Sequence, residues 1–374
     1  MKYIVAICRI LVGVLFIISG LIKANDPIGF SYKLQEYFEV FGMEFFVPYA
    51  LTLSVLITVF EIVCGVATLI GSRMKLFSWL LLLMIVFFTF LTFYSAYFNK
   101  VTDCGCFGDA LHLTPWQSFT KDIVLLVWIL PIFIWRNKIQ PIFSSKINNG
   151  LIIASTVISF WFNLNCIMHL PAIDFRPYKI GTDIAKSMSI PDGAPLDVTE
   201  TILYYQKDGV TKEFTTKTYP WQDTLWKWVK TENKVIIEGY KPLIHDFSIN
   251  TEDGENITDS ILKTPGFTFM LVAYDIKKTD KDIQKEINIF QAECEKNKIP
   301  FFGISGSIGK DIEDFRHQNQ CMYPYYSCDG TALKTIIRSN PGLVLLEKGV
   351  VKGMWHKNDF PKFNDLKSTF TLTK

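Results

Sequence analysis

Residues 4–23 read IVAICRILVGVLFIISGLIK, an apolar run whose only charged residue before Lys23 is Arg9. A helix needs about 20 such residues to cross the hydrocarbon core of a bilayer. Four more runs of this kind follow within the first 170 residues: 48–70, 76–98, 119–135 and 149–168. We therefore expect five membrane-spanning helices, with the lipid bilayer as the first partner of the chain.

The remaining residues have a different composition. The 374-residue chain is 49% hydrophobic with a net charge of +2, but most of its charge lies in residues 171–374, which are typical of a soluble domain. No basic patch or arm stands out, so we expect no nucleic-acid partner. The predicted units are a membrane bundle (1–148), a fifth spanning helix (149–170), a linker with a small β-rich aromatic region (171–239) and an α/β domain (240–374).

The distribution of lysine and arginine predicts the orientation of the spans. Lys2, Arg73, Lys75, Arg136, Lys138 and Lys146 fall on one side, and fewer basic residues fall on the other. Because basic residues concentrate in cytoplasmic loops, the N-terminus is expected in the cytoplasm. Five spans then place the C-terminal domain outside it, which in a bacterium means an inner-membrane protein with a periplasmic domain. Cysteine pairs persist in that oxidising space.

The loop after the third span carries Cys104-Gly105-Cys106-Phe107-Gly108-Asp109. A disulfide between cysteines separated by one glycine closes a very small ring, so we expect it to be strained and easily reduced. Cys104 and Cys106 are our candidate catalytic residues. A structural disulfide or two ordinary thiols remain the alternatives. A soft metal ranks below these, and no metal site is predicted.

Charged residues inside the spans are the next candidates. Glu61 falls near the middle of the second span, where an isolated carboxylate is costly. We expect it to face the bundle interior with Arg9 as the nearest cation in depth, either as a structural ion pair or as a proton-handling or ligand-binding group. Lys23 and Asp26 follow the first span on the outer side, and Asp109 closes the cysteine loop.

A family resemblance supports these candidates. The residues Arg9, Ser19-Gly20, Lys23, Asp26-Pro27, Tyr37, Glu61, Gly65 and the Asp103–Asp109 loop resemble the DoxX and MauE group of four-helix membrane proteins over roughly residues 1–140. The resemblance to MauE-type members implies that the chain helps to mature periplasmic quinoprotein dehydrogenases through disulfide chemistry. The resemblance to DoxX-type members implies quinone-coupled oxidation of sulfur compounds, so a quinone is the candidate cofactor.

The soluble half predicts alternating strands and helices. Expected strands are 201–206, 213–216, 245–250, 267–274, 300–305, 343–347 and 350–355, and expected helices are 280–295, 310–317 and 360–370. Trp221, Trp226 and Trp228 are spaced so that one helix or a lid could carry all three, and we expect core or interface aromatics rather than a binding cage. The order from about 240 resembles thioredoxin-like proteins, with Ser339–Gly342 where that fold places its cis-proline.

One departure from the thioredoxin pattern matters for mechanism. Thioredoxin-like proteins carry their reactive thiol just after the strand that here is 267–274, whereas this chain reads Asp275-Ile276-Lys277-Lys278. We therefore expect a degenerate domain without thiol exchange at that position. Cys321 and Cys328 are the candidates for a structural disulfide.

Two functional hypotheses result. In the first, the chain is a membrane thiol–disulfide or quinone-linked redox protein, a candidate oxidoreductase serving periplasmic proteins. In the second, it is a non-enzymatic envelope assembly protein whose redox-inactive pseudo-thioredoxin domain binds a protein partner. A transporter is disfavoured because the spans show no inverted repeat.

Overall fold

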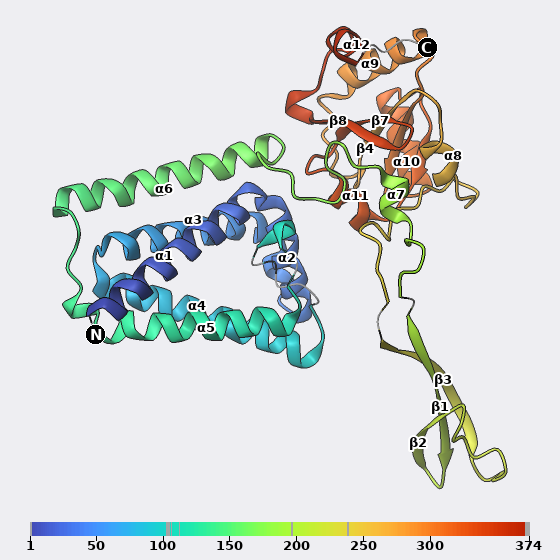
Figure 1. Cartoon of the computed structure of the whole chain (residues 1–374). Coiled ribbons are helices and arrows are strands. Elements are labelled where there is room, and N and C mark those ends of the chain that lie inside the picture. Colours follow the sequence, from blue (N-terminus) through green and yellow to red (C-terminus); the bar gives the residue numbers. More distant parts are fainter. Residues whose placement is uncertain are drawn as a thin grey trace. The chain divides into compact units, whose positions relative to one another are not determined.

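The computed structural model of the chain describes residues 2–101, 105, 107–111, 113–195, 197–237 and 239–370. Within these residues, five helices are long and apolar enough to cross a membrane (Figure 1). They are α1 (Lys2–Asn25), α3 (Ala50–Ile70), α4 (Met74–Phe98), α5 (Pro115–Ile134) and α6 (Ser145–Met168). Each covers one of the five predicted runs to within two residues, so the predicted membrane-helix bundle is confirmed.

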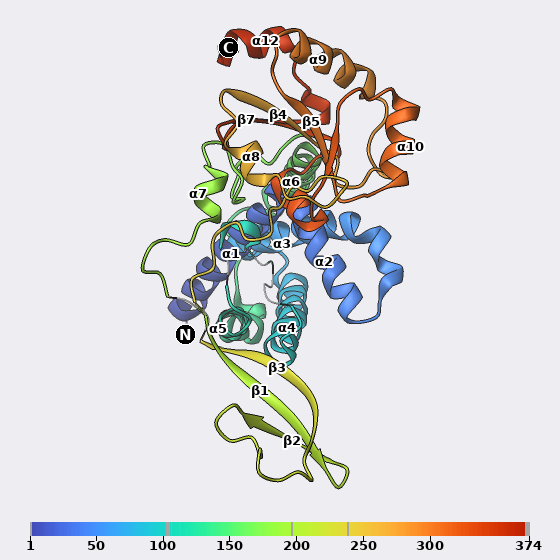
Figure 2. The ribbon, with the colours of Figure 1, turned by 90° about the vertical axis from the view of Figure 1, so that its right-hand side faces the viewer.

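The helices α1 and α3 pack closely because glycines face each other across the contact. A Cβ at Gly13 would lie 3.0 Å from the carbonyl oxygen of Gly65, and a Cβ at Gly65 would lie 2.8 Å from that of Gly13. Farther along, a Cβ at Gly20 would meet Ile62. The two helices therefore run antiparallel, and small residues let their backbones approach as expected inside a bilayer. Helices α4 and α5 lie beside these two (Figure 2), and their buried residues complete the core of the bundle.

A further helix, α2 (Pro27–Val40), lies in the segment between the first two spans, which the sequence analysis left without secondary structure. The carboxylate of Asp26 accepts a hydrogen bond from Gly29 N at 2.8 Å and caps its N-terminus, with Pro27 in the first turn. Proline ends one helix but also suits the first turn of the next. A 3₁₀ segment, η1 (Glu44–Tyr49), leads from α2 towards α3, and η2 (Gly108–Ala110) and η3 (Arg136–Lys138) flank α5.

The C-terminal domain is built on a five-stranded sheet with the order β6-β5-β4-β7-β8. Strand β4 (Phe267–Val272) pairs parallel with β5 (Phe301–Ser305) and antiparallel with β7 (Gly342–Glu347). The outer strands are β6 (Tyr325–Ser327) and β8 (Val350–His356). The helices of this domain are α8 (Thr258–Leu262), α9 (Gln284–Lys296), α10 (Lys310–Asn319), α11 (Gly330–Ile336), η4 (Lys357–Asp359) and α12 (Phe363–Phe370).

Helices cover both faces of this sheet. Residues 269–272 of β4 are all fully buried, although successive side chains of a strand point to opposite faces. Phe269 and Leu271 pack with residues of α9 and α12 in one core. This layering, the mixed sheet and the cis peptide bond between Asn340 and Pro341 confirm the predicted thioredoxin-like α/β fold.

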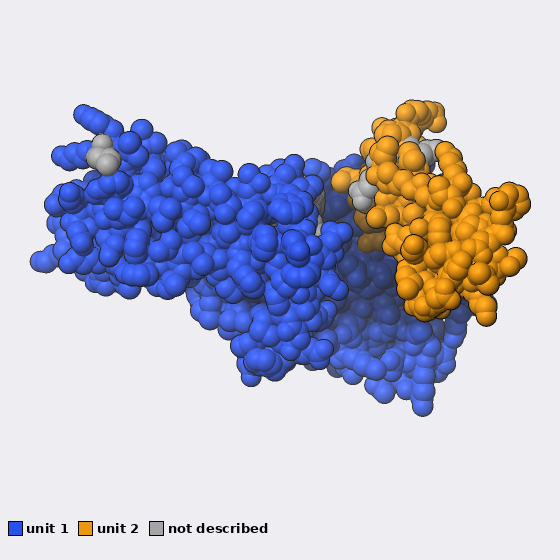
Figure 3. Space-filling view, turned by 90° about the horizontal axis from the view of Figure 1, so that it is seen from below, with its two compact units in different colours: residues 1–182, 248–374 blue, residues 183–247 orange. Residues whose placement is uncertain are grey.

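Residues 183–247 form a second compact unit, coloured separately in Figure 3. After the short helix α7 (Ile184–Met188), it contains a three-stranded antiparallel sheet with the order β2-β1-β3. The strands are β1 (Val198–Lys207), β2 (Val210–Thr215) and β3 (Lys227–Ile237), and the predicted Asp208-Gly209 turn joins the first two. One helix shared by the three tryptophans is excluded, because Trp228 lies on β3. The strand predicted for 245–250 is reduced to single bridges at Asn250.

Candidate functional site

Lys23 and Glu61 form a buried pair of opposite charges between two of the spanning helices. The ammonium of Lys23, near the end of α1, lies 2.5 Å from the Glu61 carboxylate on α3, and their side chains are 3% and 7% exposed. The ammonium also lies 5.5 Å from the ring centre of Phe30 and 5.6 Å from that of Phe88. The pair is thus a buried charge pair in an aromatic setting.

The structure assigns Glu61 a different partner from the one expected. Arg9 donates to the carbonyl oxygens of Thr68 and Leu69, at 3.2 and 2.9 Å. The antiparallel register of α1 and α3 is the reason, because it places Arg9 beside the C-terminal carbonyls of α3 and Lys23 beside Glu61. Arginine at a helix C-terminus satisfies carbonyls that have no partner within the helix.

A second charged pair lies on α5. Lys121 Nζ is 2.6 Å from the carboxylate of Asp122, whose side chain is 1% exposed. The other carboxylate oxygen accepts a hydrogen bond from the Thr92 hydroxyl of α4 at 2.9 Å. Lys121 and Asp122 were not among the predicted site residues. The signal that could have identified this pair is the occurrence of two adjacent opposite charges at the start of an apolar run.

Both ion pairs line one cavity of about 70 Å³ inside the bundle. Phe107, which follows Cys106 in sequence, also lines it, and the Lys121 ammonium lies 5.6 Å from the centre of that ring. The volume holds several water molecules but is smaller than the cavity of about 150 Å³ that accepts benzene in an engineered protein. The cavity does not fit a quinone ring, so we derive no step through a quinone.

The candidate cysteines Cys104 and Cys106 lie outside the described residues, but the residues around them are defined. Gly105 between them is buried with φ +66°, in the left-handed region that favours glycine. A Cβ there would lie 2.9 Å from Cγ of Lys33 on α2. Gly108 N donates to Gly105 O at 3.1 Å, so a tight turn joins the centre of the cysteine pair to η2.

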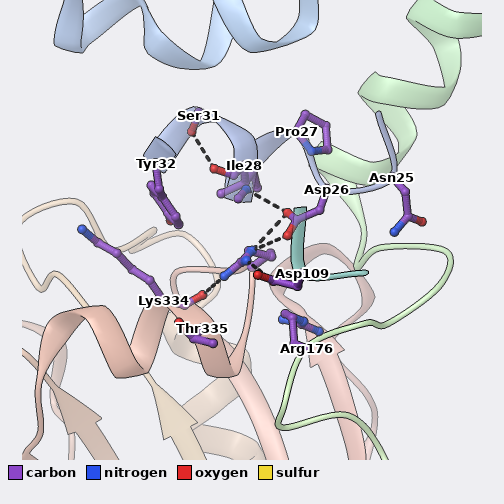
Figure 4. Close-up of polar contacts among 12 residues, drawn as sticks. Asn25, Asp26, Pro27, Ile28, Ser31, Tyr32, Asp109, Arg176, Lys334 and Thr335 are labelled. Atoms are coloured by element: carbon purple, nitrogen blue, oxygen red, sulfur yellow. Dashed lines mark hydrogen bonds and ion pairs between the residues drawn. The ribbon is translucent and has the colours of Figure 1, made fainter. Parts of the chain in front are cut away.

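The carboxylates of Asp26 and Asp109 meet at Arg338 of the thioredoxin-like domain (Figure 4). The guanidinium donates Nε–H to both oxygens of Asp26, at 3.0 and 2.8 Å, and Nη2–H to Asp109 at 3.0 Å. Its Nη1 donates to Lys334 O, so each of the three guanidinium nitrogens donates a hydrogen bond. Burial lowers the pKa of Arg338, but the two carboxylates outweigh it and raise that pKa. Sequence reasoning missed Arg338 entirely.

The degenerate site of the thioredoxin-like domain lies beside this cluster. β4 continues into Tyr274 and Asp275, and the hydroxyls of Tyr274 and Tyr32 are 3.4 Å apart. Burial raises the pKa of the Tyr32 hydroxyl. Arg338 lies just before β7, whose Gly342 pairs with Val272 at the end of β4. The edge that would carry the thiol in a thioredoxin-like protein therefore faces α2.

The remaining cysteines of this domain are part of its packing. Cys294 on α9 is fully buried, and burial raises the pKa of its thiol. Cys321 is a buried thiol outside any disulfide, so the predicted Cys321–Cys328 disulfide is not formed. The intervening chain runs through extended β6 at about 3.3 Å per residue, whereas a disulfide needs Cα atoms within about 7 Å. Among the described residues, no group of three or more metal-ligating side chains occurs.

Comparisons with known proteins identify similar sequences for parts of the chain. Residues 1–135 match the family described as methylamine utilisation protein MauE, and residues 199–238 match a domain of unknown function, DUF8463. Protein TlpB of Flavobacterium psychrophilum is 26% identical over 214 residues. That match covers 56% of this chain and 57% of TlpB, so the chain matches little more than half of that relative's length.

A solved structure is also similar to part of the chain. It is the solution structure of a protein assigned as a disulfide isomerase from Bacteroides thetaiotaomicron, with 18% identity, 34% of this chain, 84% of that chain and a TM-score of 0.27. The fold assignment of the C-terminal domain stands on its own strand order and layering. The chain therefore combines a membrane domain that is similar to the MauE family over residues 1–135 with a thioredoxin-like domain.

Proposed function

We propose that this membrane protein is a thiol–disulfide oxidoreductase in which Cys104 and Cys106 exchange disulfides with a protein substrate. The observation that carries the proposal is the shared cavity. Phe107, the residue after Cys106, lines it together with the Lys23–Glu61 and Lys121–Asp122 pairs. The cysteine loop thus adjoins buried acid and base groups, which is the setting expected for chemistry that moves protons.

The proposed exchange is balanced within the cysteine pair and its substrate. A substrate thiolate attacks one sulfur of the Cys104–Cys106 disulfide, and that S–S bond breaks to give a mixed disulfide. A second substrate thiolate then displaces the cysteine of this protein. The substrate gains a disulfide, two electrons pass to Cys104 and Cys106, and these accept two protons. A second protein disulfide of higher potential would reoxidise the pair.

The Lys23–Glu61 pair is our candidate for handling those protons. Its two groups are almost inaccessible to bulk solvent, while the cavity beside them is large enough for water. Water in the cavity would connect them to the loop. Arg9 is outside this arrangement, because it is bound to carbonyls at the C-terminus of α3.

We further propose the cellular setting and domain limits from the sequence pattern. The protein is placed in a bacterial inner membrane with a cytoplasmic N-terminus. The cysteine loop and C-terminal domain face the periplasm. The units are the bundle (1–148), the fifth span (149–170), the linker and small β-rich region (171–239) and the thioredoxin-like domain (240–374).

Trapping of a mixed disulfide tests the exchange directly. In the Cys106→Ser variant, the Cys104 thiolate attacks the disulfide of the protein that reoxidises the pair, and no second thiol is present to release the mixed disulfide. Membranes prepared after an acid quench should therefore contain a higher-mass adduct that dithiothreitol removes. The same test with Cys104→Ser covers the opposite order of attack. Cys294→Ser is the matched control, because that thiol is fully buried. Absence of an adduct in both loop variants would contradict the proposal.

A specific observation favours the second candidate, a non-enzymatic partner-binding protein. All eleven residues of β3 are exposed, and β3 is an edge of its sheet. Exposed edge strands with apolar residues are sites where other chains add strands. This reading predicts a co-purifying partner that survives Cys104→Ser but is lost when Val235 and Ile237 are both replaced by lysine. Retention of the partner in the lysine variant would reject it.

A further inference from the structure

Arg338 connects three parts of the chain that are far apart in sequence. Its carboxylate partners lie 312 residues away at Asp26 and 229 residues away at Asp109. The side chain is only 5% exposed. One guanidinium thereby holds the N-terminus of α2 and the end of the cysteine loop together (Figure 4).

The surrounding backbone leaves space for this contact. A Cβ added at Gly29 would lie 2.3 Å from Asp26 Oδ2 and 2.7 Å from Arg338 Nη2. The first turn of α2 therefore admits the guanidinium only because residue 29 lacks a side chain. Asp26 is fixed as well, since it accepts the hydrogen bond from Gly29 N.

A short covalent and hydrogen-bonded route leads from Arg338 to the cysteine pair. Asp109 belongs to η2, which begins at Gly108. Gly108 N donates to the carbonyl of Gly105, the residue between the two cysteines. The Lys33 side chain of α2 lies close to Gly105, since a Cβ at residue 105 would be 2.9 Å from Lys33 Cγ. A residue that fixes Asp109 thus also restricts the conformation of Gly105.

The thioredoxin-like domain uses for this contact the edge at which β4 ends. That edge carries Tyr274 and Asp275 and no cysteine follows β4 there. Any thiol on which the domain acts at this edge must therefore come from another part of the chain. Asp109, which Arg338 binds here, closes the loop that carries Cys104 and Cys106.

We propose that Arg338 is a positioning residue for the Cys104–Cys106 pair, through which the thioredoxin-like domain, by fixing Asp109 and the turn at Gly105, shifts the equilibrium of the pair towards the disulfide. This inference rests on the proposed function and assigns the degenerate domain a part in it. Releasing Asp109 frees the turn at Gly105 and increases the freedom of the dithiol form. The equilibrium of the pair then shifts towards the dithiol.

The test is a redox titration of purified full-length protein in lipid nanodiscs. Reduced and oxidised glutathione set the potential, and a mass-tagged maleimide reports the fraction of dithiol after an acid quench. Arg338→Gln is expected to shift the equilibrium about tenfold towards the dithiol, which raises the midpoint by about 30 mV for this two-electron couple. Arg338→Lys keeps the charge but not the planar fork, so a smaller shift in the same direction is expected.

A loop variant and a matched arginine variant complete the test. Asp109→Asn replaces the carboxylate by an amide of the same size and leaves the thioredoxin-like domain unmutated. It should shift the equilibrium in the same direction as Arg338→Gln. The double variant should shift no further than Arg338→Gln alone. Arg176→Gln removes another buried arginine of this protein, one that binds Asp174 and Ile336 O. It should titrate within twofold of the wild type.

The outcomes separate this inference from the function on which it rests. A wild-type pair that never interconverts between dithiol and disulfide overturns both. A pair that titrates normally but is unchanged in Arg338→Gln or Asp109→Asn overturns the inference alone. An equal shift in Arg176→Gln also overturns it, because the effect is then general destabilisation.

Discussion

Replacing Lys23 by methionine is expected to loosen the membrane bundle strongly. The substitution leaves the Glu61 carboxylate, now 2.5 Å from the Lys23 ammonium and 7% exposed, without its cation. Removing one partner of a buried ion pair costs about 3–5 kcal/mol, since the remaining charge stays buried. The free energy of opening the bundle should fall by that amount.

Labelling of Cys64 measures this opening. Cys64 is fully buried on α3, three residues after Glu61, so a maleimide reaches it only when the bundle opens. The assay uses chains in which the other seven of the eight cysteines are replaced. At 1.4 kcal/mol per tenfold change, Lys23→Met should label about 10²- to more than 10³-fold faster than the parent.

The double variant Lys23→Met, Glu61→Leu is the internal control. It replaces both charges by apolar groups, which is often neutral or stabilising by about 1–4 kcal/mol. Cys64 in this variant should label no faster than in the parent. Labelling of Lys23→Met within threefold of the parent would refute the description of this pair as a buried, mutually dependent charge pair.

Three other predictions concern single positions. Burial lowers the pKa of His356 to about 4. Because its unfolded value is higher, its contribution to stability is present above about pH 6.5 and lost as the pH falls towards 4, on the order of 2–3 kcal/mol. Unfolding at pH 7 and pH 4.5 should show this loss in the parent and a smaller one in His356→Asn. Gly105→Ala places a side chain at φ +66°, costing about 1–2 kcal/mol, so the loop disulfide should form more slowly in a mass-tag assay. Gly65→Ala puts a Cβ 2.8 Å from the backbone oxygen of Gly13 and should speed the labelling of Cys64, whereas Gly150→Ala, with open space around it, should not.

The spans and the alternating strands could be predicted because they follow from local composition. Runs of about 20 apolar residues define the spans, and the strand at 267–272 is a continuous apolar run between turn residues. Asp26-Pro27 was read only as the end of a helix, although the same pair caps and begins α2. Because the same local pattern is typical of a helix end and of a helix start, the sequence alone could not show that a new helix begins here.

The partners of the charged residues could not be predicted in the same way. Arg9 was the expected partner of Glu61, and only the packing of α1 on α3, fixed by contacts such as Gly20 with Ile62, brings Lys23 to it instead. Arg338 carries no local motif, and its two carboxylates are hundreds of residues away. Such contacts depend on the tertiary fold, which periodicity along one segment does not contain.

The most direct measurement of the central claim is the redox state of the loop in living cells. Cells are quenched with acid before and after a pulse of diamide or dithiothreitol, and a mass-tagged maleimide counts the reactive thiols at Cys104 and Cys106 against a variant lacking both. Our account predicts that both forms are present at rest and that the ratio moves with each pulse and returns within minutes. A loop that stays in one form through both pulses would contradict it.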